Sequence, residues 1–298
     1  NIKAVAFVGS SKIAEIVYSR STANGKRALC LGGAKNHLIV TPDANEQTTV
    51  NGVISSSMGS AGQRCMAASA MVGVGNIDPI VDAIKTESQN IVPGENLGAV
   101  ISKEAKEKIE HYIQEAIDEG ATLLLDGRNP VVPGKENGYY IGPTILDHVT
   151  PTMNIAKEEV FGPVLAIIRT ETMDEAIQIQ NHSNYGNGAA VFTQSGRSSQ
   201  YIARQLKAGM VGVNIGDDQL SGDSSLESGP STENLMQKRN HYLDGLNSSF
   251  LKLDDDLQAI SCLRTEMLNA RSEIFKKKEQ ALDKKAVVEE NEHRLERD

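Results

Sequence analysis

Short apolar segments alternate with segments of helical periodicity along the first 216 residues of the chain. Such an alternation is typical of βαβ units, in which helices join parallel strands and pack on the faces of the sheet. We therefore predict an α/β fold with a largely parallel sheet. The predicted strands are 2–8, 28–31, 37–41, 70–74, 123–125, 165–168, 189–193 and 210–213, and the predicted helices are 11–19, 45–58, 79–86, 103–119, 173–181 and 198–206.

Composition limits the core and the partners of such a fold. The chain is 39% hydrophobic but only 4% aromatic and has no tryptophan, so the core has to be aliphatic. A net charge of −9, without a basic stripe of interleaved aromatic residues, argues against nucleic acid as a partner. No apolar run reaches membrane-spanning length, and no signal peptide is evident. Three cysteines make no disulfide framework, which fits a reducing compartment.

One cysteine stands in a setting that could activate it. Small residues at 59–62 precede Cys65, and a helix-compatible run at 66–68 follows it. At the start of a helix, the helix dipole favours the thiolate, which is the nucleophilic form of cysteine. We therefore expect Cys65 to lie at a helix start and to act as a nucleophile. The alternative is a buried and inert cysteine.

Four short stretches occur in an order that resembles one enzyme superfamily. They are 7–11 (FVGSS), 31–37 (LGGAKNH), 62–65 (GQRC) and 158–164 (EEVFGPV). Through them, residues 1–216 resemble the aldehyde dehydrogenase superfamily, and within it most the CoA-acylating methylmalonate/malonate-semialdehyde dehydrogenases. The resemblance implies that residues 1–33 are the remnant of an NAD-binding domain and that residues 34–216 are an aldehyde dehydrogenase catalytic domain.

The resemblance also implies a reaction and its residues. NAD would oxidise a small semialdehyde of valine catabolism through a thioester on Cys65, and coenzyme A would accept the acyl group. Arg64 would hold the substrate carboxylate, because a guanidinium can bind a carboxylate bidentately. The residues implied to bind NAD are Phe7, Gly9, Ser10, Glu159 and Phe161. Without the resemblance, Ser10 fits a plain helix N-cap, Glu159 a solvated carboxylate and Phe161 a core aromatic residue.

One position departs from the pattern of the hydrolytic members of the superfamily. Their water-activating glutamate corresponds to Leu31 here or, shifted by one residue, to Cys30. Neither side chain is a carboxylate, so neither can serve as the general base. We therefore expect deacylation to coenzyme A. The alternatives are a decayed active site and a hydrolytic enzyme of broad substrate range.

Two further polar residues come from the same stretches. Lys35 matches the interdomain lysine of the superfamily, and its alternative is a surface lysine beside a turn. His37 belongs to the same run and is interpreted as structural. His111, His148 and His182 have no companions at ligand spacing, so no metal site is expected.

The superfamily pattern ends near Gly216, and a different sequence follows. Residues 217–233 are rich in Ser, Asp and Gly and predict a flexible linker. In 234–298, apolar residues recur at every seventh position from Leu246 to Leu295, which predicts a helical coiled coil. We expect a homo-oligomer, formed through residues 243–295. The alternative for this segment is a single amphipathic helix that lies on the protein.

The ends of the chain bear on its activity. The chain starts at Asn1 within a motif, so we expect a fragment that lacks the oxyanion-hole asparagine and most of the NAD-binding domain of the superfamily. The alternative function is a catalytically silent dehydrogenase fragment that acts as a coiled-coil interaction protein. The expected compartment is the cytoplasm or, alternatively, the mitochondrial matrix.

Overall fold

A computed structural model describes residues 2–216 of the 298-residue chain. The predicted linker at 217–233 and the predicted coiled coil at 234–298 lie outside the described residues. None of the helices in the described part is long and apolar enough to cross a membrane.

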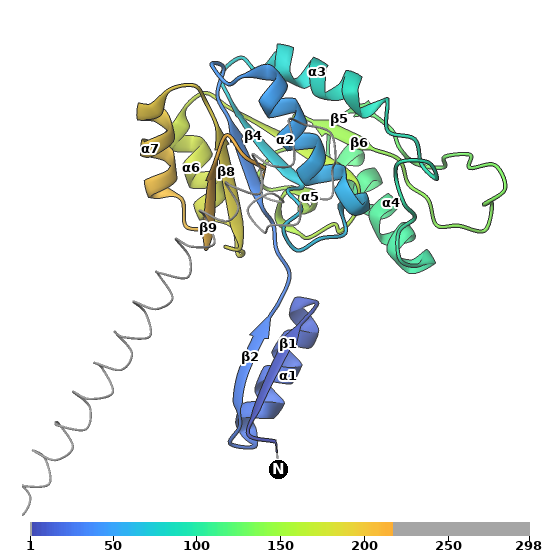
Figure 1. The fold of residues 1–298 in the computed structure, drawn as a ribbon, viewed down its shortest axis with the longest axis vertical. Helices are drawn as coiled ribbons and strands as arrows, with labels where there is room; N and C mark the ends of the chain where they lie inside the picture. The colour runs from blue at the N-terminus through green and yellow to red at the C-terminus, as the bar shows by residue number, and fades with distance from the viewer. Residues whose placement is uncertain (1, 217–298) are drawn as a thin grey trace, which may run out of the picture. The chain divides into compact units, whose positions relative to one another are not determined.

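A seven-stranded sheet forms the centre of the described part (Figure 1). Its strand order is β5-β6-β7-β4-β3-β8-β9, and every neighbouring pair is parallel except the antiparallel pair of β5 and β6. The predicted α/β fold with a largely parallel sheet is confirmed. The strands are β3 (His37–Val40), β4 (Ala70–Val74), β5 (Thr122–Leu125), β6 (Thr144–Asp147), β7 (Val164–Thr170), β8 (Gly188–Phe192) and β9 (Met210–Val213).

Helices cover both faces of this sheet, and the alternation of side chains along each strand divides the core in two. In β3, Leu38 and Val40 pack in the core beneath two helices, whereas Ile39 points into the core on the other face. Among the buried hydrophobic residues of the described part, Phe192 carries the only aromatic ring, so the core is aliphatic as predicted. The helices are α2 (Glu46–Met58) and α3 (Asp78–Ser88) on one face, and α4 (Lys103–Asp118), α5 (Asn154–Lys157), α6 (Met173–Asn181) and α7 (Gly196–Gln205) on the other.

Local sequence signals explain where the helices begin. The Asn45 side chain accepts a hydrogen bond from Thr48 N at the start of α2, at 2.9 Å. Thr172 and Glu175 form a reciprocal capping box at the start of α6. The sequence analysis missed β6 and α5. Each spans only four residues, which is too short to show a recognisable period.

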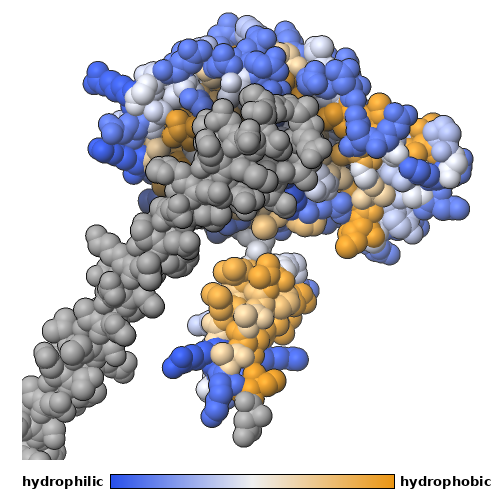
Figure 2. Space-filling model, in the orientation of Figure 1, coloured by the Kyte–Doolittle hydropathy of each residue, from blue (hydrophilic) through white to orange (hydrophobic). Residues whose placement is uncertain are grey.

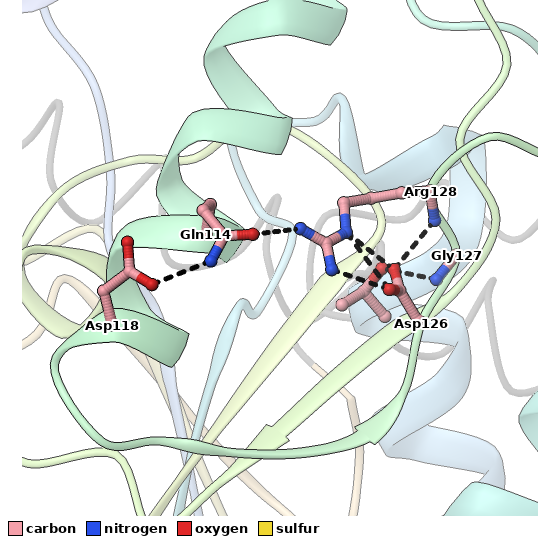
Figure 3. A network of polar contacts seen from close by, with 6 residues as sticks. Gln114, Asp118, Asp126, Gly127 and Arg128 are labelled. Atoms are coloured by element: carbon pink, nitrogen blue, oxygen red, sulfur yellow. Dashed lines mark hydrogen bonds and ion pairs between the residues drawn. The ribbon is translucent and has the colours of Figure 1, made fainter.

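A polar network fixes the turn after β5 to helix α4 (Figure 3). Arg128 pairs with Asp126 at 2.7 Å and donates to the Gln114 side chain at 2.9 Å. Gln114 in turn donates to Asp118 at 2.8 Å. The Arg128 hydrogen bonds lower the pKa of the Asp126 carboxyl.

The first 31 residues contain a separate βαβ unit. In it β1 (Ala4–Val8) pairs in parallel with β2 (Arg27–Leu31), and α1 (Ser11–Ala23) joins them. Only one face of this two-stranded sheet is partly covered, so Leu29 is 62% and Leu31 52% exposed. Figure 2 shows the apolar surface gathered on this unit. Its interpretation as the remnant of an NAD-binding domain stays a prediction.

Candidate active site

Four loops meet at the edge of the sheet where the parallel strands begin. Asn36 directly precedes β3, Asn187 directly precedes β8, and Pro163 directly precedes β7. Cys65 lies in the loop that leads into β4. Because β8, β3, β4 and β7 are parallel neighbours, their amino ends share one edge. The fold thus gathers four segments that are far apart in the sequence.

Cys65 is a free, exposed cysteine, so the alternative of a buried cysteine is wrong. The expectation of a helix start is also wrong. Cys65 lies in a turn that the Ala67 N–H closes by donating to the Arg64 carbonyl at 3.0 Å. Ala68 N then donates to Ser56 O, and the chain continues toward β4 instead of coiling. The expected activation of this thiol by the start of its own helix is therefore absent.

A left-handed turn precedes the cysteine. Ser60, Ala61 and Gly62 have φ angles of 52°, 53° and 67°. For residues with a side chain, this conformation costs about 1–2 kcal/mol each, so the surrounding structure has to hold it. At Gly62, a Cβ would lie 2.0 Å from the Gly162 carbonyl oxygen, which only glycine avoids. The loop that carries Cys65 is therefore packed closely against the loop that leads into β7.

Two asparagines that the sequence analysis missed hold the Cys65 main chain. The buried Asn36 side chain donates to the carbonyls of Cys65 (2.9 Å) and Ala67 (3.0 Å), and it accepts from Gly188 N at 3.0 Å. Asn187 donates to the same Cys65 carbonyl at 3.1 Å. The available signal was that each asparagine directly precedes a strand of the parallel sheet.

Arg64 lies against the end of helix α2. Its guanidinium donates to the Ser55 carbonyl at 2.5 Å, and a Cβ at Gly59 would lie 2.5 Å from Arg64 Nη2. A cation near the last carbonyls of a helix is favourable, because these carbonyls carry partial negative charge. A role for Arg64 in holding a substrate stays a prediction.

The start of α1 offers a place for an anion. Ser10 is the N-cap residue of α1, but its side chain makes no capping hydrogen bond, and the first turn contains no acidic residue. Ser10 thus stands at the N-cap position, as its alternative interpretation has it, but its side chain does not cap the helix. Gly9 N donates to Leu31 O, which joins the turn to the end of β2. A Cβ added at Gly9 would lie 2.7 Å from the Phe7 ring.

Glu159 and Phe161 lie in the loop that also contacts Gly62. The Glu159 carboxylate accepts from Ala34 N at 3.1 Å, and a Cβ at Gly33 would lie 2.5 Å from its other oxygen. Phe161 is 39% exposed, so the alternative of a core aromatic residue is wrong. Its φ of 60° turns the chain sharply before β7.

Residues 1–224 match the Aldehyde dehydrogenase family. This chain belongs to that family. It is 45% identical over 221 residues to the human mitochondrial methylmalonate-semialdehyde/malonate-semialdehyde dehydrogenase [acylating], a match that covers 72% of this chain and 41% of the human protein. It is 44% identical over 222 residues to malonate-semialdehyde dehydrogenase 1 of Bacillus licheniformis, covering 72% of this chain and 45% of that protein.

Solved structures of aldehyde dehydrogenases share the fold. The putative methylmalonate-semialdehyde dehydrogenase of Sinorhizobium meliloti, complexed with NAD, superposes with a TM-score of 0.70 at 42% identity. That match covers 72% of this chain and 45% of the solved chain. The chain thus spans less than half the length of these relatives.

The two ionisable residues that flank Asn36 in the sequence are both buried. Lys35 is 1% exposed, so the alternative of a surface lysine is wrong, and its Nζ donates to Ile155 O at 2.6 Å. Burial lowers the pKa of Lys35 from 10.5 to about 7, against the attraction of Glu159 and Glu158. Burial and the Lys35 charge lower the pKa of His37 to about 4, so His37 is neutral at pH 7.

Proposed function

We propose that Cys65 is the nucleophile of a semialdehyde oxidation that ends in an acyl-CoA. The substrate class is methylmalonate or malonate semialdehyde, in keeping with the names of the relatives. The observation that carries the proposal is the exposed Cys65 thiol, held at the point where four strand-leading loops meet. A fixed and accessible nucleophile is the first requirement of covalent catalysis.

The proposed reaction has three steps. The Cys65 thiolate attacks the aldehyde carbon, a C–S bond forms, and the carbonyl electron pair moves to oxygen. That carbon then loses a hydride with its electron pair and becomes a thioester. The CoA thiolate attacks the thioester carbon, the C–S bond to Cys65 breaks, and the Cys65 thiolate is regenerated. NAD, when bound, supplies the acceptor of the hydride.

The residues near α1 fit a dinucleotide. The N–H groups at the start of a helix attract phosphate, and Ser10 leaves its hydroxyl outside the capping bonds of α1. We assign Gly9 and Ser10 to the pyrophosphate. The Glu159 carboxylate can accept several hydrogen bonds and would bind a ribose hydroxyl as well as Ala34 N. Phe7 and Phe161 would add apolar contacts.

The side chains at the end of β2 favour coenzyme A over water as the acyl acceptor. Leu31 ends this strand with an apolar side chain, and Cys30 beside it is half-buried. Neither can remove a proton from water as a carboxylate would. Arg64 would hold the substrate carboxylate, with its guanidinium plane oriented by the bond to Ser55 O.

The test uses the full 298-residue chain. Semialdehyde and NAD should leave an acyl adduct on Cys65, detected by peptide mass spectrometry, and added CoA should remove it as acyl-CoA. Cys65→Ala should abolish the adduct, and Cys30→Ala should keep it. An unchanged rate of NADH formation in Cys65→Ala would refute the proposal. Equal turnover without CoA would instead favour a hydrolytic dehydrogenase.

A further inference from the structure

We propose that Asn36 is a positioning residue that fixes the direction in which Cys65 presents its sulfur. The inference rests on the proposed role of Cys65 as the nucleophile. It assigns no contact with substrate to Asn36. Its basis is the set of hydrogen bonds that one buried carboxamide makes to two other segments, the chain before β4 and the start of β8.

The Asn36 carboxamide uses both of its N–H donors and also its oxygen. Its amide nitrogen donates to the carbonyls of Cys65 and Ala67, and its oxygen accepts from the Gly188 N–H, all within 2.9–3.0 Å. The side chain is 1% exposed, so water does not compete for these partners. Asn36 thus ties the chain before β4 to the start of β8, from its own place at the start of β3.

These bonds determine the geometry at the Cys65 Cα atom. A peptide unit is planar, so a fixed carbonyl fixes the whole unit. The unit before Cys65 is fixed through Arg64 O, which accepts from Ala67 N. The unit after it is fixed through Cys65 O, which accepts from Asn36 and Asn187. With both flanking planes held, the Cα–Cβ bond of Cys65 has one direction, and the sulfur can take only the staggered positions about that bond.

The local chain does not supply this direction by itself. Cys65 lies in a turn outside any helix or strand, and the left-handed residues Ser60 and Ala61 precede it. Such residues keep their conformation only where neighbouring groups hold them. Without the Asn36 donors, the carbonyls of Cys65 and Ala67 would be free to turn away, and the sulfur would move with them.

The variant Asn36→Asp tests the two N–H donors of Asn36 without changing how its side chain packs. This variant keeps the volume and the oxygen that accepts from Gly188 N, but it removes both N–H donors. The matched control is Asn181→Ala, because Asn181 also joins two segments, by donating to Gln205 O (2.8 Å) and accepting from Lys207 N (2.7 Å). Asn187→Ala is a milder variant, which removes one hydrogen bond to Cys65 O. It replaces Asn36→Asp in the experiment if that variant does not fold.

The readout is acylation of Cys65 by p-nitrophenyl acetate, which requires a positioned nucleophile but no cofactor. In Asn36→Asp we expect the maximal rate constant of acylation to fall about 10- to 100-fold, with the half-saturating ester concentration little changed, because misplacement of a reacting group carries losses of this order. Alkylation of Cys65 by iodoacetamide, which reports accessibility, should change by less than about 3-fold. Asn181→Ala should keep both rates.

The pH dependence of the acylation rate adds a second measurement, which a general loss of rigidity would not change. A carboxyl that faces two carbonyl oxygens is favoured in its protonated form, which can donate one hydrogen bond. The ratio of the Asn36→Asp rate to the wild-type rate should therefore rise as the pH falls. Equal acylation in wild type and in Asn36→Asp (or Asn187→Ala), or an equal loss in Asn181→Ala, would overturn the inference. Wild-type protein without acylation at Cys65 would refute the proposed function, and the inference with it.

Discussion

Gly62 and Gly162 touch so closely that a methyl group at Gly62 would lie 2.0 Å from the Gly162 carbonyl oxygen. The contact joins the loop that carries Cys65 to the loop that carries Phe161. The backbone of Gly62 also has a φ of 67°, which side chains disfavour. Shape and conformation together require glycine here.

Gly62→Ala should therefore destabilise the protein and slow acylation of Cys65. We expect a loss of unfolding free energy of about 2–4 kcal/mol, from left-handed strain plus overpacking. Gly134→Ala is the matched control, because Gly134 has a φ of 74° but nothing within 4 Å of the added Cβ. Urea unfolding measures the loss of stability, and the acylation rate measures the effect on Cys65. Equal losses in the two variants would show that the contact with Gly162 contributes nothing.

Lys35 should make stability depend on pH above neutrality. Its pKa is about 7 in the folded chain and 10.5 ordinarily, so between these values the unfolded chain binds more protons. Stability then rises with pH, because deprotonation removes the cost of burying the charge. The full cost is present below pH 7. Lys35→Met should flatten this rise in urea unfolding between pH 7 and pH 10, and an unchanged slope would contradict the assignment.

Asp147 should contribute far more to stability than a similar exposed aspartate. Arg169 binds it with both ends of the fork, at 2.9 and 2.7 Å, and the Asp147 side chain is 5% exposed. Asp147→Asn should cost about 1–3 kcal/mol, because it removes the charge-assisted hydrogen bonds at this buried position, while Arg169 keeps its second partner, Asp78, at 2.8 Å.

The control is Asp126→Asn, which breaks the Arg128 pair where the aspartate is 38% exposed, and it should cost about 0–1 kcal/mol. Burial by itself would raise the pKa of Asp147, but the hydrogen bonds and charge of Arg169, together with the His148 N–H, outweigh burial, so the pKa is lowered. Its contribution is therefore present above the ordinary carboxyl pKa and is lost as the pH falls through the lowered value. Chemical denaturation at several pH values measures both the stability losses of the two variants and the pH dependence of the Asp147 contribution.

The bare face of the β1–β2 sheet should promote association. Leu29 and Leu31 project from this face, and contiguous exposed apolar surface favours aggregation. Replacing both leucines by serine should lower light scattering at constant protein concentration, with little change in unfolding midpoint. Lys12→Ser, on the exposed start of α1, is the control. Unchanged scattering would exclude this face as the source of association.

Much of the fold could be predicted from the sequence, because local patterns encode it. The periods that predicted Ala70–Val74, Met173–Asn181 and Met210–Val213 gave their observed bounds. Short elements such as β6 were not predicted, because four residues are too few to show a period. The stretches at 7–11, 31–37, 62–65 and 158–164 were enough to indicate the family.

The sequence by itself determined which residue types are present and which segments form strands and helices, because these depend on neighbours along the chain. Only the tertiary structure decided that Cys65 lies in a turn and that Lys35 is buried. It also decided that Asn36 and Asn187 meet at one carbonyl. The reason is that the order of strands in a parallel sheet depends on hydrogen bonds and packing between distant segments, for which a single sequence carries no local signal.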